Sequence, residues 1–284
     1  ADLLFLQEVG PLASLDDLLK GTDYEDFQRA YTTDKKGQPY DERNLVVLSR
    51  YEIQEKKQYL HDLVEHPQWK KMTAVPKEKE AEEVTWERPI LHCKISLAGD
   101  RVFNAINLHL KSKIPTEIKG QKKGKYMWLS HQGWAEGFFI SSVKRVGQAL
   151  ETRILLAQIF AEKSEQTLIA VCGDFNAEIE SVPFEVIVGS VVDTENPDLR
   201  STVMVPCEYN VPPDERYSLL HHGKGEMLDH VIVSQALYPY WTETAIFNEL
   251  LPDKSIPFAT QEKFPESDHA PVVARFRLPK AWLP

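Results

Sequence analysis

An acid and an amide follow one of the most apolar runs of the chain, in the segment CGDFNAE (172–178). Side chains alternate in direction along an extended backbone, so Asp174 and Asn176 point the same way while Phe175 points into a core. The carboxylate is able to hold a hard cation or a water, and the amide is able to donate to a phosphoryl oxygen. A turn in which Asp and Asn cap the backbone explains the same residues equally well. The segment alone therefore leaves a catalytic and a structural interpretation open.

Other apolar runs deliver residues of the same kinds. LQEV (6–9) places Glu8 at the end of an apolar run, and NLHLKS (107–112) does the same for His109. SDHAPV (267–272) puts Asp268 and His269 immediately before a run. A His beside a carboxylate can be held as a proton acceptor or can bind a metal. Taken singly, an acid at a strand end is usually solvated and a lone His is usually packed.

An acid also interrupts the apolar segment MLDHVIVS (227–234), at Asp229. A carboxylate buried without a partner is costly, and a His is its natural partner. The adjacent His230 would face the opposite side of a strand, so a structural role is expected for it.

The case for a single site comes from convergence, because five segments each deliver an acid, an amide or a His. Oxygen ligands for Mg²⁺ or Mn²⁺, an imidazole, and donors for developing phosphate charge are the parts of a metal-assisted phosphoryl-transfer site. The three Cys residues are widely separated, which argues against a thiolate zinc site.

The elements that would position these residues are mostly strands. Apolar runs rich in Val, Ile and Phe recur, and in RVFNAINLHL (101–110) apolar and polar residues alternate with the period of a strand. Helical patterns cover residues 12–20 and 134–163, and a third begins near Ser181. Gly147 weakens the middle of the second helix by roughly 1 kcal/mol. We expect two packed sheets with helices outside, in one domain over residues 1–284. The charged segment 55–87 and the basic segment 111–125 are predicted as surface excursions.

The bulk composition limits the function classes. The 284 residues carry a net charge of −10, which removes the long-range attraction used by nonspecific binders of polyanions. No apolar run approaches the roughly 20 residues that span a bilayer. The opening ADLLFLQEVG has neither the basic region nor the cleavage site of a signal peptide. Together with the separated Cys residues, this predicts a cytoplasmic protein.

The chain resembles the endonuclease/exonuclease/phosphatase family, which includes deoxyribonuclease I-like enzymes. The matching motifs follow the order of the family and span residues 3 to 276: LQEV, NLVVLSR, NLHLKS, GDFNAE, LDHVIVS and SDHAPV. The resemblance implies a four-layered α/β sandwich, two packed mixed sheets flanked by helices, with the site at one end of the sheets. It also implies a Mg²⁺-dependent or Mn²⁺-dependent phosphoester hydrolase, most simply a phosphodiesterase or nuclease.

The same resemblance implies a role for each residue. Glu8 would be a metal ligand, and Asp268 would complete the metal site or steer the imidazole. Asp174 and Asn176 would orient the attacking water and bind phosphate. The remaining two roles concern imidazoles: His109 would donate to the phosphate, and His269, paired with Asp229, would act as base or transition-state stabiliser.

One departure from the family pattern concerns the start of the chain. The family has an earlier strand, some thirty residues before LQEV, that supplies an Asn metal ligand. We expect this strand to be omitted from residues 1–284, because a core strand at residue 3 would otherwise have an unpaired neighbour position.

Several residues are candidates for substrate binding. Arg43 and Asn44 precede an apolar run and could line the cleft, whereas a surface salt bridge is the preferred interpretation for Arg88. Lys111 and Lys113 open a basic segment that follows His109 and is followed in turn by aromatic residues. Such a segment suits a strand of DNA or RNA or a phosphorylated headgroup, and a solvated loop is the alternative.

Two further hypotheses stay open. One is a catalytically impaired protein that uses the site for binding. The other is a lipid or small-molecule phosphatase or phosphodiesterase of the same fold. A lipid enzyme would need an exposed aromatic wedge, for which Trp69 and Trp128 are the candidates. No protein partner is inferred.

Overall fold

The largest sheet of the protein has six strands, three of which carry a predicted site residue: His109, Asp174 and Asp229. The computed structural model describes residues 1–163, 166–256 and 267–284. The six strands are β4 (Ile53–Tyr59), β7 (Ile90–Leu97), β8 (Arg101–His109), β11 (Leu168–Asp174), β12 (Val205–Pro206) and β15 (Asp229–Val233). They run in the order β12-β15-β11-β8-β7-β4, with β8 and β11 parallel and the other neighbours antiparallel.

A smaller antiparallel sheet packs on one face of the first. Its strands are β1 (Leu3–Val9), β2 (Gln28–Tyr31) and β3 (Asn44–Ser49), in the order β1-β3-β2. A separate antiparallel pair is formed by β16 (Trp241–Ile246) and β17 (Val272–Phe276). Val47 of β3, Ala105 of β8 and Ala170 of β11 lie in one buried cluster, against which Ala274 of β17 packs. This cluster is the core between the sheets.

An apolar cavity of about 1190 Å³ lies between β1 and β17. It is lined by Leu3 and Phe5 of β1 and by Val272, Ala274 and Phe276 of β17. Within the described residues, β1 pairs only with β3 and β17 only with β16, so each strand keeps one edge without a strand partner. The additional strand that the resemblance implies stays a prediction, and both edges that could pair with it line this cavity.

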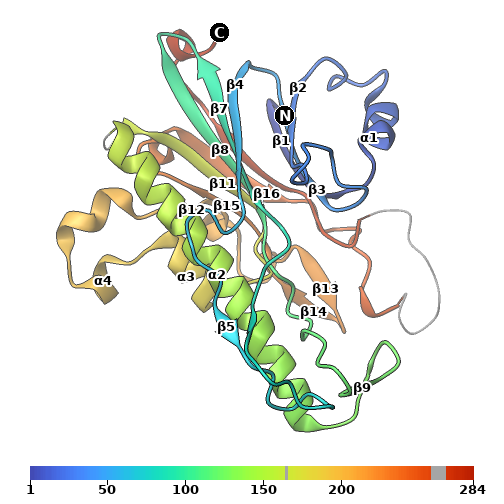
Figure 1. Cartoon of the computed structure of the whole chain (residues 1–284). Helices are drawn as coiled ribbons and strands as arrows, with labels where there is room; N and C mark the ends of the chain where they lie inside the picture. Colours follow the sequence, from blue (N-terminus) through green and yellow to red (C-terminus); the bar gives the residue numbers. More distant parts are fainter. Residues whose placement is uncertain (164–165, 257–266) are drawn as a thin grey trace.

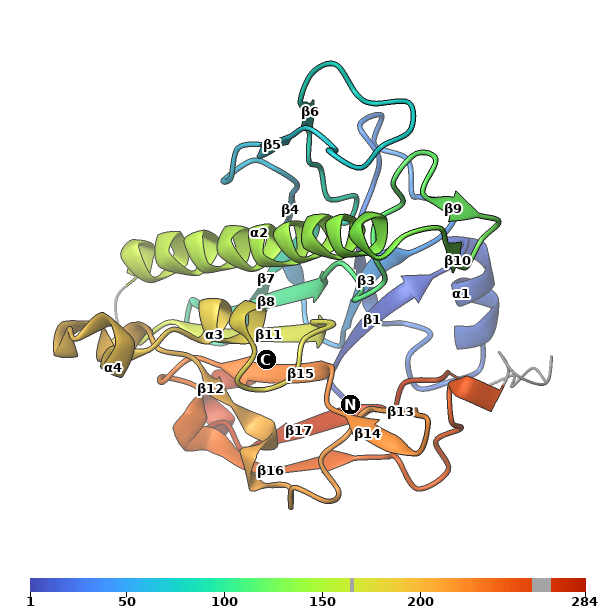
Figure 2. The same ribbon diagram turned by 90° about the horizontal axis from the view of Figure 1, so that it is seen from below.

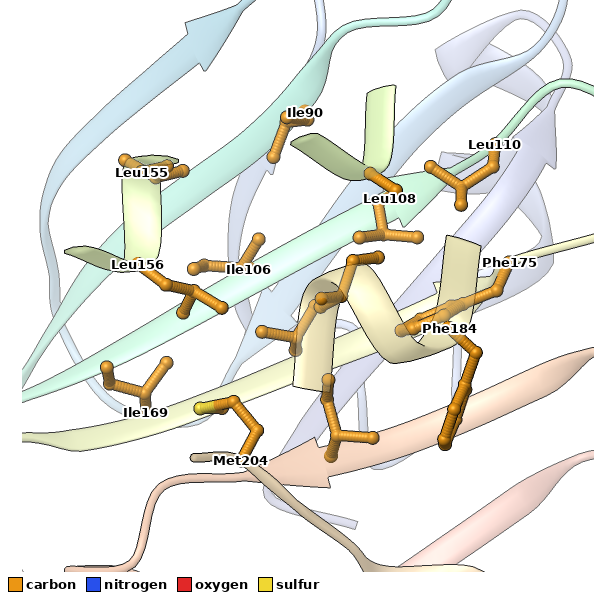
Figure 3. Close-up of a cluster of buried hydrophobic side chains, with 14 of the residues drawn as sticks. Ile90, Ile106, Leu108, Leu110, Leu155, Leu156, Ile169, Phe175, Phe184 and Met204 are labelled. Atoms are coloured by element: carbon orange, nitrogen blue, oxygen red, sulfur yellow. The ribbon is translucent and has the colours of Figure 1, made fainter. Parts of the chain in front are cut away.

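Helices cover the outer faces of the two sheets (Figures 1 and 2). Leu155 and Leu156 of α2 (His131–Lys163) pack on Ile106 and Leu108 of β8, beside Phe184 of α3 (Val182–Val188) (Figure 3). On the other side, Leu15 and Leu19 of α1 (Leu12–Leu19) pack on Val46 and Leu48 of β3. The layers therefore run helix, small sheet, large sheet, helix, and the predicted mixed α/β class is confirmed.

The remaining elements are short. Three small hairpins pair β5 (Gln68–Trp69) with β6 (Glu82–Glu83), β9 (Lys122–Lys123) with β10 (Met127–Trp128), and β13 (Leu219–His221) with β14 (Lys224–Glu226). Helix α4 spans Val191–Thr194, and 3-10 turns span Pro197–Thr202, Cys207–Asn210, Tyr238–Tyr240 and Lys280–Trp282. No helix among the described residues is both long and apolar enough to cross a bilayer.

The predicted surface excursion over residues 55–87 is wrong at its start. β4 covers residues 53–59 and pairs with β7 at the edge of the large sheet. The strand escaped prediction because four of its side chains, over residues 54–57, are exposed and mostly charged, as is common where an edge must resist further pairing. Near the other end of the segment, Trp86 is only 2% exposed.

The packing of Trp86 explains why a glycine occupies position 147 of α2, where it was predicted to weaken the helix. A β-carbon at this position would lie 2.5 Å from the ring of Trp86. The indole donates a hydrogen bond through Nε1 to Glu151, one turn further along the helix, at 3.0 Å. The lost helix propensity at Gly147 is therefore offset by burial of a tryptophan.

Candidate active site

Asp174 ends β11 at the centre of the large sheet, with a site residue opposite it on each side. The strand register pairs Asp174 with His109 of β8 and with Asp229 of β15. The preceding Gly173 has φ +136°, and a β-carbon there would lie 2.0 Å from the carbonyl oxygen of Leu108. Only glycine permits this close approach, so Gly173 allows the strands to deliver three polar side chains to one place.

The carboxylate of Asp174 is held by His109 and Asn176. Nε2 of His109 lies 3.1 Å from Oδ2 of Asp174. The backbone N–H and the side-chain amide of Asn176 donate to the two carboxylate oxygens at 2.7 and 2.9 Å. The amide also donates to the carbonyl of Leu110 at 3.1 Å. The structural interpretation of GDFNAE is confirmed, because Asn176 caps the turn and orients the acid, and the catalytic interpretation stays a prediction.

Glu8 lies on the β1 side of this group. Its Oε1 is 3.9 Å from Nε2 of His109 and 3.7 Å from Nη2 of Arg88. The Glu8 side chain is 62% exposed, whereas that of Arg88 is 17% exposed. Arg88 also donates to the carbonyl of Leu110 at 3.0 Å. The salt bridge that the sequence favoured for Arg88 is present, to the exposed Glu8, but the Arg88 side chain itself is largely buried beside the site.

A second carboxylate–imidazole pair, Asp229 and His269, lies beside Asp174 and His109. Nδ1 of His269 lies 2.7 Å from Oδ2 of Asp229. The hydroxyl of Ser218 accepts the backbone N–H of Asp229 at 3.0 Å, and the carbonyl of Ser218 accepts the N–H of Ala270 at 2.8 Å. Ser218 therefore joins the two chain segments that carry the pair.

The charges of these residues depend on one another. Burial favours the neutral form of Asp174, but the hydrogen bond and charge of His109, the charge of His269 and the backbone N–H of Asn176 together outweigh burial and lower its pKa. Burial raises the pKa of Asp229; the hydrogen bond to His269 opposes this effect and the charge of Asp174 adds to it. Burial disfavours the imidazolium of His269, yet the hydrogen bond and charge of Asp229, with the charges of Asp174 and Asp268, outweigh it and raise the pKa of His269 to about 9. At neutral pH, Asp174 is a carboxylate and His269 an imidazolium.

Asp174, Asp229 and His269 also form the group of possible metal ligands within the described residues. Their ligand atoms all lie within 4.8 Å of one another. Glu8 and Asp268, the ligands implied by the resemblance, are not members of this group. Oδ2 of Asp268 instead lies 2.9 Å from Nζ of Lys254.

The predicted substrate-binding residues differ in their surroundings. Asn44 is fully buried, and its amide donates to the carbonyls of Val9, Gly10 and Tyr40, so it shapes the end of β1 and does not face a cleft. Arg43 is exposed and adjoins Arg88, whose pKa is lowered mainly by burial and in part by the charge of Arg43.

Lys111 and Lys113 are both engaged by the chain itself. Nζ of Lys111 donates to Ser112 and to the carbonyl of Ile114. Burial, against the opposing charge of Glu87, lowers the pKa of Lys111 to about 8. Nζ of Lys113 lies 3.1 Å from Glu178 and 2.6 Å from Glu226. The basic segment is therefore fastened at its start and is not a solvated loop there.

Some residues that build the site gave no signal in the sequence. Ser218 lies in a turn-rich segment with nothing to mark it. Asn107 is fully buried, accepts from Gln7 at 2.7 Å, and donates to the carbonyls of Leu6 and Val46, which fixes β1 on β8. Its position two residues before His109 was a possible clue. His230 is buried against Glu208 at 2.5 Å, in agreement with the structural role expected for it.

Solved structures resemble this chain over nearly its whole length. A 3′ phosphatase, NExo, from Neisseria bound to product DNA hairpin matches with a TM-score of 0.54 and 15% identity, covering 98% of this chain and 89% of that one. The mannosyl-6-phosphatase of Bacteroides thetaiotaomicron matches with a TM-score of 0.55 and 13% identity, covering 98% and 85%.

An endonuclease/exonuclease/phosphatase family protein from the same organism matches with a TM-score of 0.55 and 15% identity, covering 95% and 79%. No family model and no curated protein sequence matches the chain. The structural likeness shows that the chain has the fold of endonuclease/exonuclease/phosphatase proteins, as its motifs predicted.

Proposed function

We propose that the chain is a divalent-metal-dependent phosphoester hydrolase that acts on a phosphodiester by attack of water on phosphorus. The observation that carries this proposal is the placement of Asp174. This acid is buried and ionised, it is oriented by His109 and Asn176, and it stands beside the imidazolium of His269. A fixed base beside a fixed positive charge suits a reaction in which water attacks a phosphoester.

Each residue has a role in this scheme. Asp174 accepts the proton of the attacking water, because its lowered pKa keeps it ionised at neutral pH. Asn176 fixes the direction of the carboxylate through its two hydrogen bonds. Nε2 of His109 holds Asp174, and the donation to a phosphoryl oxygen that the resemblance implies for His109 is its second proposed role.

His269 serves as a positive charge and not as a base. The resemblance left both roles open, and a pKa of about 9 means that the imidazole already carries its proton at neutral pH. Asp229 holds the ring and stabilises its charge. The imidazolium then stabilises the negative charge that develops on the phosphoryl oxygens or on the leaving group.

The donors at the site fit a hard cation. Glu8, Asp174 and Asp229 offer carboxylate oxygens, which Mg²⁺ and Mn²⁺ prefer. A protonated His269 has no free electron pair to give, so the carboxylates are the more suitable ligands. Glu8 is the proposed main ligand because it is exposed and forms no ion pair closer than 3.7 Å with any described residue, whereas Asp268 would first have to leave Lys254. A bound metal would polarise the phosphoester and neutralise developing charge.

Known proteins of this fold support the reaction class. Two of the matching structures are a 3′ phosphatase with a product DNA hairpin and a mannosyl-6-phosphatase. Phosphomonoesters and phosphodiesters are both compatible with such a site, and the fold does not choose between them. A protein that only binds its ligand is disfavoured, since binding alone does not require an acid aligned from three sides.

The test is an activity screen with Mg²⁺ and with Mn²⁺. The substrates are bis-p-nitrophenyl phosphate, p-nitrophenyl phosphate, short DNA and RNA, and phospholipid headgroups. We expect metal-dependent hydrolysis of the diester and its loss in His269→Ala. If a full-length protein hydrolyses none of these substrates, the proposal that the chain is an enzyme is wrong. If His269→Ala retains full activity, the assignment of the active site is wrong. Preference for the monoester would correct the substrate class.

A further inference from the structure

A rim of exposed apolar side chains surrounds the β9–β10 hairpin and the first turns of α2. We call this set the hairpin rim. Its members and their exposed fractions are Ile114 (70%), Tyr126 (62%), Met127 (61%), Leu129 (58%), Trp134 (45%) and Phe138 (41%). Scattered exposed apolar residues are ordinary on a protein surface, but a contiguous group usually marks an interaction site.

Packing shows that the elements carrying these residues are in contact. A β-carbon at Gly137 of α2 would lie 2.3 Å from the carbonyl of Thr116 and 2.9 Å from the ring of Trp128. The helix, the hairpin and the segment after Ile114 are therefore in direct contact. On α2 itself, the rings of Trp134 and Phe138 stack with their centroids 5.7 Å apart.

The hairpin rim rests on a rigid base. Ile118 is fully buried, and Trp128 and Trp69 pack around the same small cluster. Beside it, Glu136 accepts hydrogen bonds from Trp69 and Thr73. Trp69 and Trp128, which were expected to act as an exposed wedge, thus pack inward and support the hairpin rim. The hairpin-rim residues beside them reach solvent.

Positive charge accompanies the apolar side chains. The segment 111–125 carries six Lys residues and one acid, in a chain whose net charge is −10. Nζ of Lys122 lies 5.2 Å from the ring centre of Trp128, and Nζ of Lys125 lies 5.1 Å from that of Tyr126. Lys119 and Lys123 are exposed nearby. Lysines beside aromatic and aliphatic side chains suit the boundary between lipid headgroups and acyl chains.

The hairpin rim lies at the same end of the molecule as the candidate active site. Figures 1 and 2 both place β9 at the end where β13 and β14 lie. The connection is also direct along the chain, because Lys113 follows His109 by four residues and contacts Glu226 of β14 at 2.6 Å. A surface that met the hairpin rim would therefore lie close to the site.

We propose that the hairpin rim docks on a lipid bilayer that contains anionic phospholipid. Ile114, Met127 and Leu129 enter the boundary region, and the lysines contact anionic headgroups. A nucleic acid fits less well, since Ile114, Met127 and Leu129 do not stack on bases as the aromatic members Tyr126, Trp134 and Phe138 could. Docking itself is independent of catalysis. The consequence that the enzyme cleaves a phosphoester presented by the membrane rests on the proposed function.

The experiment is co-sedimentation with vesicles of phosphatidylcholine and phosphatidylserine, compared with phosphatidylcholine alone. We expect binding to the anionic vesicles. Met127→Asp with Leu129→Asp should weaken it at least tenfold, and Lys122→Glu with Lys123→Glu by about fivefold or more for each lysine. The control carries Val192→Asp and Leu250→Asp, at side chains that are 84% and 95% exposed elsewhere, and should bind like the wild type.

Several outcomes would overturn the proposal. These are no binding to anionic vesicles, equal losses in the control, or binding of short single-stranded DNA in place of vesicles, measured by fluorescence anisotropy. Circular dichroism and hydrolysis of bis-p-nitrophenyl phosphate should be unchanged in the hairpin-rim variants. His269→Ala should still bind vesicles, so failure of the proposed function and failure of docking give different results.

Discussion

Nδ1 of His269 lies 2.7 Å from Oδ2 of Asp229, although 40 residues separate them in the sequence. Ser218 brings them together by holding the backbone of both segments. The pairing places a positive charge next to Asp174, and the strength of that charge depends on Asp229.

Replacement of Asp229 is therefore expected to lower the pKa of His269. In metal-free Asp229→Asn, the pKa should fall from about 9 toward the ordinary value of about 6.5, because the charge that offsets burial is gone. The measurement is an NMR titration of the imidazole resonances. His92 is an internal reference, since its own pKa is lowered by burial and Asp229 does not contribute. An unchanged pKa for His269 would contradict the pairing.

The same pair predicts how stability depends on pH. Folding raises the pKa of His269, so the pair stabilises the fold fully below about pH 6.5 and loses this contribution as the pH rises through about 9. The difference in unfolding free energy between wild type and Asp229→Asn should shrink over that range.

Asp174 offers a direct test of the chemistry. Asp174→Asn keeps the shape of the side chain but removes the proton acceptor, so kcat on the best substrate of the screen should fall by about 10²- to 10⁴-fold. Asn176→Ala should have a smaller effect on kcat and should cost about 1–2 kcal/mol of stability through lost hydrogen bonds. Asp193→Asn, in exposed α4, is the control. Wild-type kcat in Asp174→Asn would show that another group activates the water.

Stabilisation by a metal ion distinguishes between Glu8 and Asp268 as candidate ligands. A cation that binds only the folded protein raises its stability, by about 2.7 kcal/mol at a hundredfold excess over Kd. We expect Mg²⁺ or Mn²⁺ to raise the melting temperature, with most of the shift lost in Glu8→Gln and less of it in Asp268→Asn, whose side chain is paired with Lys254. Glu249→Gln, at another exposed acid, should behave as wild type. A full shift in Glu8→Gln would assign the cation to other carboxylates.

The strands and most of the site could be predicted from the sequence because their signals are local. Apolar runs that end in Glu8, His109 and Asp174 predict both the strand and the polar side chain at its end. The order of the motifs along the chain indicated the fold. β4 was missed because its exposed charges hide the strand pattern. Asn44 was misjudged because nothing local shows that its amide is consumed by backbone carbonyls.

Contacts between distant segments could not be predicted, because a local sequence pattern does not report them. The role of Ser218 depends on two distant segments meeting in three dimensions, and a serine in a turn has many uses. The hairpin rim shows the same limit, since periodicity reports which side chains alternate but not which face stays uncovered. The lysines of 111–125 were visible in the sequence, whereas the apolar surface beside them needed the packing of α2 on the hairpin.

Gly173 tests how closely the strands must approach. Gly173→Ala should destabilise the fold by at least ~2 kcal/mol, since the new carbon would lie 2.0 Å from the carbonyl of Leu108 at a φ of +136°. Chemical denaturation measures the loss. Gly10→Ala is the matched control, because no atom lies within 4 Å of its added carbon. Equal stability of the two variants would mean that the approach of β8 to β11 is not fixed.

The cavity between β1 and β17 leads to the last prediction. Its two bordering strands present apolar side chains and, within the part of the chain that the structure describes, edges without a strand partner. Unpaired edges of this kind tend to recruit a further strand. A chain that carries the additional strand implied by the family resemblance should therefore fill the cavity. We expect it to melt at a higher temperature than residues 1–284 and to bind less of a hydrophobic dye such as anilinonaphthalene sulfonate. A polar replacement at Phe5 should reduce that gain, because Phe5 lines the cavity, whereas one at exposed Leu18 of α1 should reduce it less. Equal melting temperatures and equal dye binding would show that the additional strand does not fill the cavity.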